Sequence, residues 1–154
     1  MERQAAKTTL KMRGEVIAEL RDKHGNLKQR SVTHNIVTSQ GDKFAAAAMY
    51  TAAYTGWGMK LGTATTAASK SGAGSYIATA DYVSGSAKAL DDGTPKAGAT
   101  NDIVQFRRLW AAGEGTSSNI NRVAITDNTT DAGEADETHT FAISVFSSAI
   151  NKGA

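Results

Sequence analysis

The side chains best suited to acid–base or metal chemistry in this chain are its three histidines, His24, His34 and His139. They stand far apart in the sequence, and none has the spacing of a metal-ligand motif. We therefore expect no catalytic or metal-binding histidine. His24 is interpreted as a solvated turn residue, and His34 as a residue that orders a strand-to-helix crossover by hydrogen bonding.

A second candidate for chemistry is the acidic segment 127–137. It places five carboxylates within eleven residues, namely Asp127, Asp131, Glu134, Asp136 and Glu137. Clustered hard oxygen ligands can bind Ca²⁺, but the spacing differs from that of an EF-hand loop. We favour a solvated hairpin loop over a calcium site. A Ca²⁺ titration that left the thermal stability unchanged would exclude the ion.

Motifs of nucleotide-binding and hydrolytic enzymes are missing from the sequence. No GxxxxGK[ST] or GxGxxG motif stands between a strand and a helix, and no nucleophile elbow surrounds any serine. The sequence therefore predicts a non-enzymatic protein with no catalytic residue, no cofactor and no bound metal.

The composition indicates a single folded domain. The chain has 154 residues, no cysteine and a net charge of +2, and no apolar run reaches the ~18 residues of a membrane span. Residues 1–9 are predicted to form a flexible N-terminal arm, and residues 10–154 one β-rich domain. We expect neither a nucleic-acid partner nor a membrane partner.

Charge is distributed unevenly along the chain. The first thirty residues hold eight Lys/Arg against four Asp/Glu, and the remainder holds nine against eleven. A basic N-terminal region on an otherwise acidic chain can orient a contact with a partner. A normally solvated hairpin is the plainer interpretation.

The elements that hold these residues follow from periodicity. Apolar and charged residues alternate from Leu10 to Arg21, which predicts a half-buried strand, and the turn 22–26 returns the chain as a second strand over 27–33. A helix is predicted over 40–53, with Ser39 as its cap and Asp42 completing a weak capping box. Its four consecutive alanines favour close packing on a sheet.

Shorter strands are predicted in the rest of the chain, over 59–61, 103–111, 120–125 and from His139 onward. A long loop at 67–101, rich in Gly, Ala, Ser and Thr, resembles an insertion. The predicted fold class is mainly β (α+β): an antiparallel β-sandwich or sheet with one alanine-rich helix packed on it and a long extended loop.

Five residues are candidates for contacts with a partner or with another subunit. Adjacent strand residues point to opposite faces, so Arg107 or Arg108 lies on an apolar face, either as a subunit contact or as a side chain that snorkels at a sheet edge. Trp57 stands close to glycines and is less constrained than Trp110, which we assign to the core. The candidates are Arg3, Lys7, Lys23, Trp57 and Arg107.

Four motifs occur in a fixed order: Thr33–Gly41 (THNIVTSQG), Leu61–Thr66 (LGTATT), Phe106–Gly115 with its GEG turn, and Ile120–Ile125 (INRVAI). Together this order resembles small structural, decoration or tail-associated proteins in the virions of tailed bacteriophages. Ala64 stands where that pattern has a second glycine.

The resemblance implies a capsid decoration, or cement, protein. Such a protein binds the major capsid protein, forms homo-oligomers, is located in the virion and is assembled in the host cytoplasm. A tail or tail-fibre (receptor-binding) component is the alternative. A carbohydrate-binding β-sandwich module is a third hypothesis, and an aromatic content of 6% offers it few stacking residues.

Overall fold

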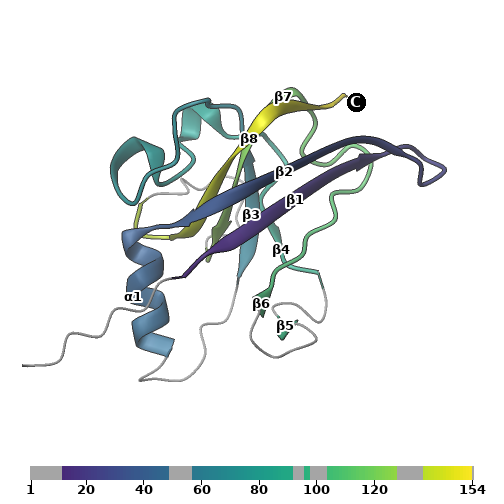
Figure 1. The fold of residues 1–154 in the computed structure, drawn as a ribbon. Coiled ribbons are helices and arrows are strands. Elements are labelled where there is room, and N and C mark those ends of the chain that lie inside the picture. Colours follow the sequence, from purple (N-terminus) through teal and green to yellow (C-terminus); the bar gives the residue numbers. More distant parts are fainter. Residues whose placement is uncertain (1–11, 49–56, 92–95, 98–103, 128–136, 154) are drawn as a thin grey trace, which may run out of the picture.

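The computed structural model describes residues 12–48, 57–91, 96–97, 104–127 and 137–153, and it is mainly β with one α-helix (Figure 1). The elements are β1 (Gly14–Arg21), β2 (Leu27–Val37), α1 (Ser39–Ala48), β3 (Gly58–Gly62), η1 (Gly72–Gly74), η2 (Thr79–Asp81), β4 (Lys88–Ala89), β5 (Lys96–Ala97), β6 (Val104–Gln105), β7 (Ser117–Thr126) and β8 (Thr140–Lys152). The predicted fold class, a sheet with one alanine-rich helix packed on it, is confirmed.

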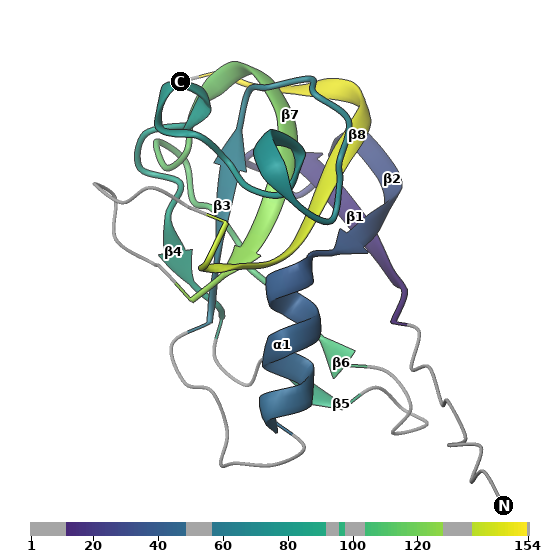
Figure 2. The ribbon, with the colours of Figure 1, turned by 90° about the vertical axis from the view of Figure 1, so that its left-hand side faces the viewer.

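A single curled sheet holds most of the strands, in the order β1-β2-β8-β7-β3-β4, with every pair antiparallel. Of the two predicted arrangements, the structure therefore has the single sheet and not the two-sheet sandwich. Strands β5 and β6 form a separate ribbon of two strands. Figure 2 shows α1 below the sheet, and it shows the segment between β3 and β4 crossing in front of the sheet.

The predicted hairpin is present, and β1 alternates between half-buried and exposed residues as its sequence predicted. At its turn, the Asp22 carboxylate accepts hydrogen bonds from the backbone of His24 (2.8 Å) and of Asn26 (2.9 Å). Gly25 has a φ of 86°, a conformation that glycine adopts without strain. The turn residues therefore fix the register of the pair.

Helix α1 begins at Ser39, one residue before the predicted start, and Thr38 caps it instead of Ser39. The Thr38 hydroxyl oxygen accepts a hydrogen bond from the Gly41 amide at 2.9 Å, and the Thr38 carbonyl accepts one from the Asp42 amide at 3.0 Å. Ser39 is exposed, and the Asp42 side chain pairs with Lys70 instead of closing a capping box. The predicted C-terminal part of this helix, residues 49–53, lies outside the described residues.

Gly41 lets the helix approach the sheet. A Cβ at this position would lie 2.1 Å from the Phe141 carbonyl oxygen of β8. No side chain fits there, so the glycine that ends the first sequence motif is required by packing.

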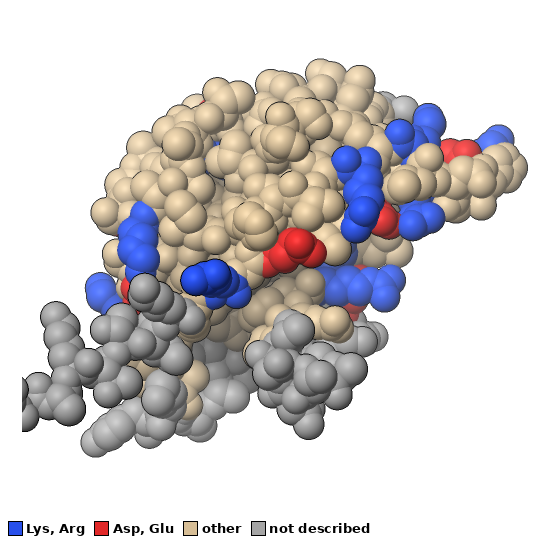
Figure 3. Space-filling view, viewed as in Figure 1, with Lys and Arg blue, Asp and Glu red and all other residues tan. Residues whose placement is uncertain are grey.

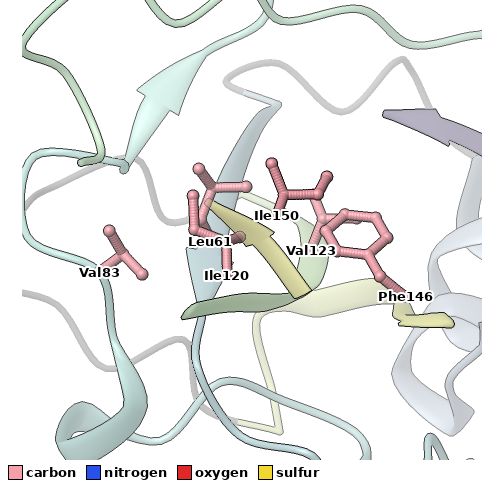
Figure 4. Packing of buried hydrophobic residues seen from close by; sticks show 6 residues of the cluster. All are labelled: Leu61, Val83, Ile120, Val123, Phe146 and Ile150. Atoms are coloured by element: carbon pink, nitrogen blue, oxygen red, sulfur yellow. The ribbon is translucent and has the colours of Figure 1, made fainter. Parts of the chain in front are cut away.

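The main core lies on the inner face of the curled sheet. Its buried members come from β3, β7, β8 and the segment before β4, and are Leu61, Val83, Ile120, Val123, Phe146 and Ile150 (Figure 4). Val16, Ala18 and Leu20 of β1 pack against them. This packing holds the inner face of the hairpin to the rest of the sheet.

The opposite face of the sheet is covered by residues 63–82, which we call the strap. Ile77 of the strap packs against Ala124 and Ile143, and all three are at most 1% exposed. The predicted insertion-like loop at 67–101 is thus folded onto the sheet in its described N-terminal part, where it supplies core residues. Residues 92–95 and 98–101 lie outside the described residues.

The predicted strand over 103–111 is present at Val104–Gln105 and wrong over 106–111, while residue 103 lies outside the described residues. The segment 106–111 pairs with no strand among the described residues, although its side chains still alternate between exposed and half-buried. Side chains hold it in place: the Trp110 indole donates to the Ser86 carbonyl at 2.8 Å, and Arg108 contacts Asp91 and Glu114 at 3.4 and 3.2 Å.

Candidate interaction surface

The outer face of the β1–β2 hairpin is the clearest candidate for a contact surface. Ile17 and Val32 form a cross-strand pair there, with exposed fractions of 51% and 42%. Two β-branched side chains in contact across a pair of strands usually point into a core. Here they point into solvent.

Charged residues surround this apolar pair. Glu15 pairs with His34 on one side in the strand register, and Glu19 pairs with Arg30 on the other, with 3.7 Å between carboxylate and guanidinium. Arg21 also contacts Glu19, at 2.7 Å. An apolar centre with a charged rim is the anatomy of a protein interface. We call Ile17, Val32 and this rim the hairpin patch.

Basic side chains gather on the hairpin (Figure 3). The described Lys and Arg residues of the hairpin are Arg13, Arg21, Lys23, Lys28 and Arg30, and its acids are Glu15, Glu19 and Asp22. Hydrogen bonds from the Asn26 side chain and backbone lower the pKa of the Asp22 carboxyl below its ordinary value. The five basic residues still outnumber the three acids. The hairpin therefore presents a net positive surface.

Among the predicted contact residues, Lys23 lies exposed at the hairpin turn, next to this patch. Arg107 is exposed at 72% of its side chain, and it pairs with Asp91 at 3.4 Å on the segment that leads to β7. Arg3 and Lys7 lie outside the described residues. The structure therefore places Lys23 and Arg107 at the surface in two separate regions.

Trp57, one of the predicted contact residues, is half-buried and packs against other aromatic rings. Its ring contacts Phe44 of α1 at 5.5 Å, Phe141 of β8 at 5.3 Å and Phe106 at 6.3 Å between centroids, all edge to face. Such pairs stabilise packing beyond the area they bury. The described contacts of Trp57 join the helix, the sheet and the segment after β6, which is an intramolecular role.

The histidines are distributed differently from the expectation. His24 is exposed, as predicted, but His34 is exposed on β2 and Thr38 shapes the crossover. His139 lies in the turn before β8, with its Nδ1 2.7 Å from an Asp127 carboxylate oxygen. Within the described ranges, no group of three or more His, Cys, Asp or Glu is placed to bind a metal ion. Most of the acidic segment, residues 128–136, lies outside those ranges.

Two fully buried cations escaped sequence reasoning. Lys60 of β3 is 0% exposed and Arg122 of β7 is 1% exposed. The strand register pairs Gly62 with Arg122 and Lys60 with Ala124, so both cations point toward the strap face of the sheet. The Lys60 ammonium lies 5.8 Å from the centre of the Tyr82 ring.

Arg122 fastens the strap to the sheet. Its guanidinium donates to the Tyr76 carbonyl at 3.0 Å and to the Thr66 carbonyl. Burial lowers the pKa of this guanidinium, and the charge of Asp81 partly opposes the effect. A Cβ on Gly62 would lie 3.0 Å from both the Arg122 and the Ile77 side chains, so the glycine of the second motif makes room for this contact.

Comparisons with known proteins identify no relative of this chain. No family model, no curated protein and no solved structure matches it. No helix in the described part of the chain has the length and hydropathy to cross a membrane.

Proposed function

We propose that this chain is a structural protein of a tailed-bacteriophage particle, and that it binds the assembled capsid shell as a decoration protein. The observation that carries the proposal is the hairpin patch, an exposed Ile17–Val32 pair inside a charged rim. The order of the four sequence motifs supports the phage assignment.

The hairpin patch suits a contact with another protein. The apolar pair gains free energy when it is removed from water, at about 25 cal/mol per Å². The charged rim fixes the orientation, and the net positive charge of the hairpin favours an acidic partner surface. On a capsid, that surface belongs to the major capsid protein.

The proposed action is mechanical. Each copy binds between neighbouring shell subunits, so its binding free energy exists only in the assembled lattice and shifts the equilibrium toward that lattice. Many copies act together, and a small contact per copy is sufficient. Neither a cofactor nor nucleic acid takes part, and the protein resides in the virion after assembly in the host cytoplasm.

Labelling the protein on intact phage particles and counting its copies tests the proposal. Hundreds of labels spread over the shell are expected. A few copies at one vertex would instead assign the protein to the tail, and labels that never bind particles would exclude a virion role.

A pair of variants locates the contact. Ile17→Asp places a charge in the hairpin patch and should reduce binding to particles that lack the protein by about tenfold or more. Leu109→Asp is the matched control, because Leu109 is equally apolar and is 65% exposed outside the hairpin. Equal losses for both variants would remove the hairpin from the contact.

A further inference from the structure

We propose that two copies of this chain associate through the free edges of β1, antiparallel, with Ala18 of one copy opposite Ala18 of the other. This pairing extends the curled sheet across a two-fold axis. It is a property of β1 alone and does not depend on the proposed capsid role.

Strand β1 ends the sheet, and no strand of the described part of the chain pairs with its outer edge. It has eight residues, whereas β4 at the other end of the sheet has two. Proteins protect edges with short strands, bulges, charged side chains (above all lysine) or proline. Strand β1 contains neither lysine nor proline, and its charged residues are Glu15, Glu19 and Arg21. The one irregularity of the pair adds Lys28 to β2, so β1 itself remains regular.

Geometry allows only a few registers for such a pair. In a two-fold antiparallel contact, residues whose backbone groups point outward must meet each other, so facing residue numbers add up to an even number. The registers centred on Ile17 and on Ala18 each align seven residues of β1, and other centres align fewer.

Charge selects between the two. Centring on Ile17 places Glu15 opposite Glu19 twice, and like charges directly opposite one another are destabilising. Centring on Ala18 places Glu15 opposite Arg21 twice. On the inner face it places Val16 opposite Leu20, two residues that already pack on the core.

The second register also accounts for the exposed apolar pair. It brings Ile17 of one copy diagonally beside Ile17 of the other, within reach of contact across the axis. Glu19 of one copy then faces Ile17 of the other directly, so the two Ile17–Val32 pairs meet along the diagonal. The Glu15–Arg21 pairs flank this diagonal contact. A second copy is thus the partner whose chemistry fits this edge.

Charge reversal tests the register in the isolated protein, with no phage particle present. Sedimentation of the full chain over a range of concentrations should show a dimer, and Glu15→Arg should weaken it by at least about tenfold because two pairs become repulsive. The double variant Glu15→Arg, Arg21→Glu should restore it. A monomeric wild-type chain, or a double variant no better than the single one, would overturn the proposal.

Cysteine cross-linking provides a second measurement, because the chain contains no cysteine. Under oxidising conditions Ala18→Cys should form a disulfide dimer, since facing strand residues lie within disulfide range. Ile17→Cys is the control and should cross-link poorly. The reverse result would place the axis on Ile17, and no cross-link at either position would reject edge pairing. Neither measurement involves the shell, so the two proposals fail separately.

Discussion

The β1–β2 hairpin and the strap face use charged residues in contrasting ways. On the hairpin, Arg21 and Arg30 share Glu19 with roughly half of each arginine side chain in water. On the strap face, Arg122 and Lys60 are buried completely, and Arg122 binds backbone carbonyls. Exposed ion pairs contribute little to stability, whereas removing a buried hydrogen-bonded cation leaves its partners unpaired. Charged residues of the hairpin can therefore be replaced without unfolding the protein, whereas those of the strap face cannot.

The largest loss of stability is expected at Arg122, on the strap face. Arg122→Ala should lower the free energy of unfolding by about 3 kcal/mol, because the carbonyls of Tyr76 and Thr66 lose their donors and a cavity opens. Denaturant unfolding measures the change. Arg122→Met is the control, because it retains volume without donors, and it should lie between Ala and the wild type. A Met variant as stable as the wild type would show that packing, not hydrogen bonding, holds the strap.

The hairpin was predictable because its signals are local. Alternation along β1 and the DKHGN turn each act over a few residues, and the strand and the turn appear where the sequence placed them. The helix start was displaced by one residue because Thr38 and Ser39 are both good caps. The close approach of Gly41 to Phe141 favours Thr38, and that contact is between residues far apart in the sequence.

The strap face was not predictable for the opposite reason. Arg122 alternates with Val123 as a solvent-facing strand residue would, but residues 63–82 fold over it. Two signals were present in the sequence. Ile77 is a large apolar residue in a segment of mostly small ones, and Gly62 is the last residue of a strand, where a glycine can mark a close approach. Both signals depend on a contact with residues far away in the sequence, which the local pattern does not identify.

A smaller loss of stability is expected at Gly62, where the strap contacts the sheet. Gly62→Ala adds one methyl group 3.0 Å from Arg122 and from Ile77, and overpacking of this kind costs about 1–2 kcal/mol. Thermal unfolding should show the loss. Gly85→Ala cannot serve as the control, because Gly85 has a positive φ that alanine adopts only with strain. Ala64→Gly, beside the same strand, is the control, and it measures the effect of added backbone freedom alone. An unchanged Gly62→Ala variant would mean that the strap shifts without cost.

The smallest loss of stability is expected on the hairpin. Ile17→Ser removes an apolar side chain that is half in water, so the free energy of unfolding of the monomer should change by about 0.5 kcal/mol or less. Ile77→Ala is the counterpart in the strap, and it should cost about 3 kcal/mol because Ile77 is 1% exposed. Denaturant unfolding at concentrations below self-association measures both. Comparable losses at the two isoleucines would mean that the hairpin is as integral to the fold as the strap. A near-silent Ile17 would mean that this side chain is kept apolar for a contact outside the monomer.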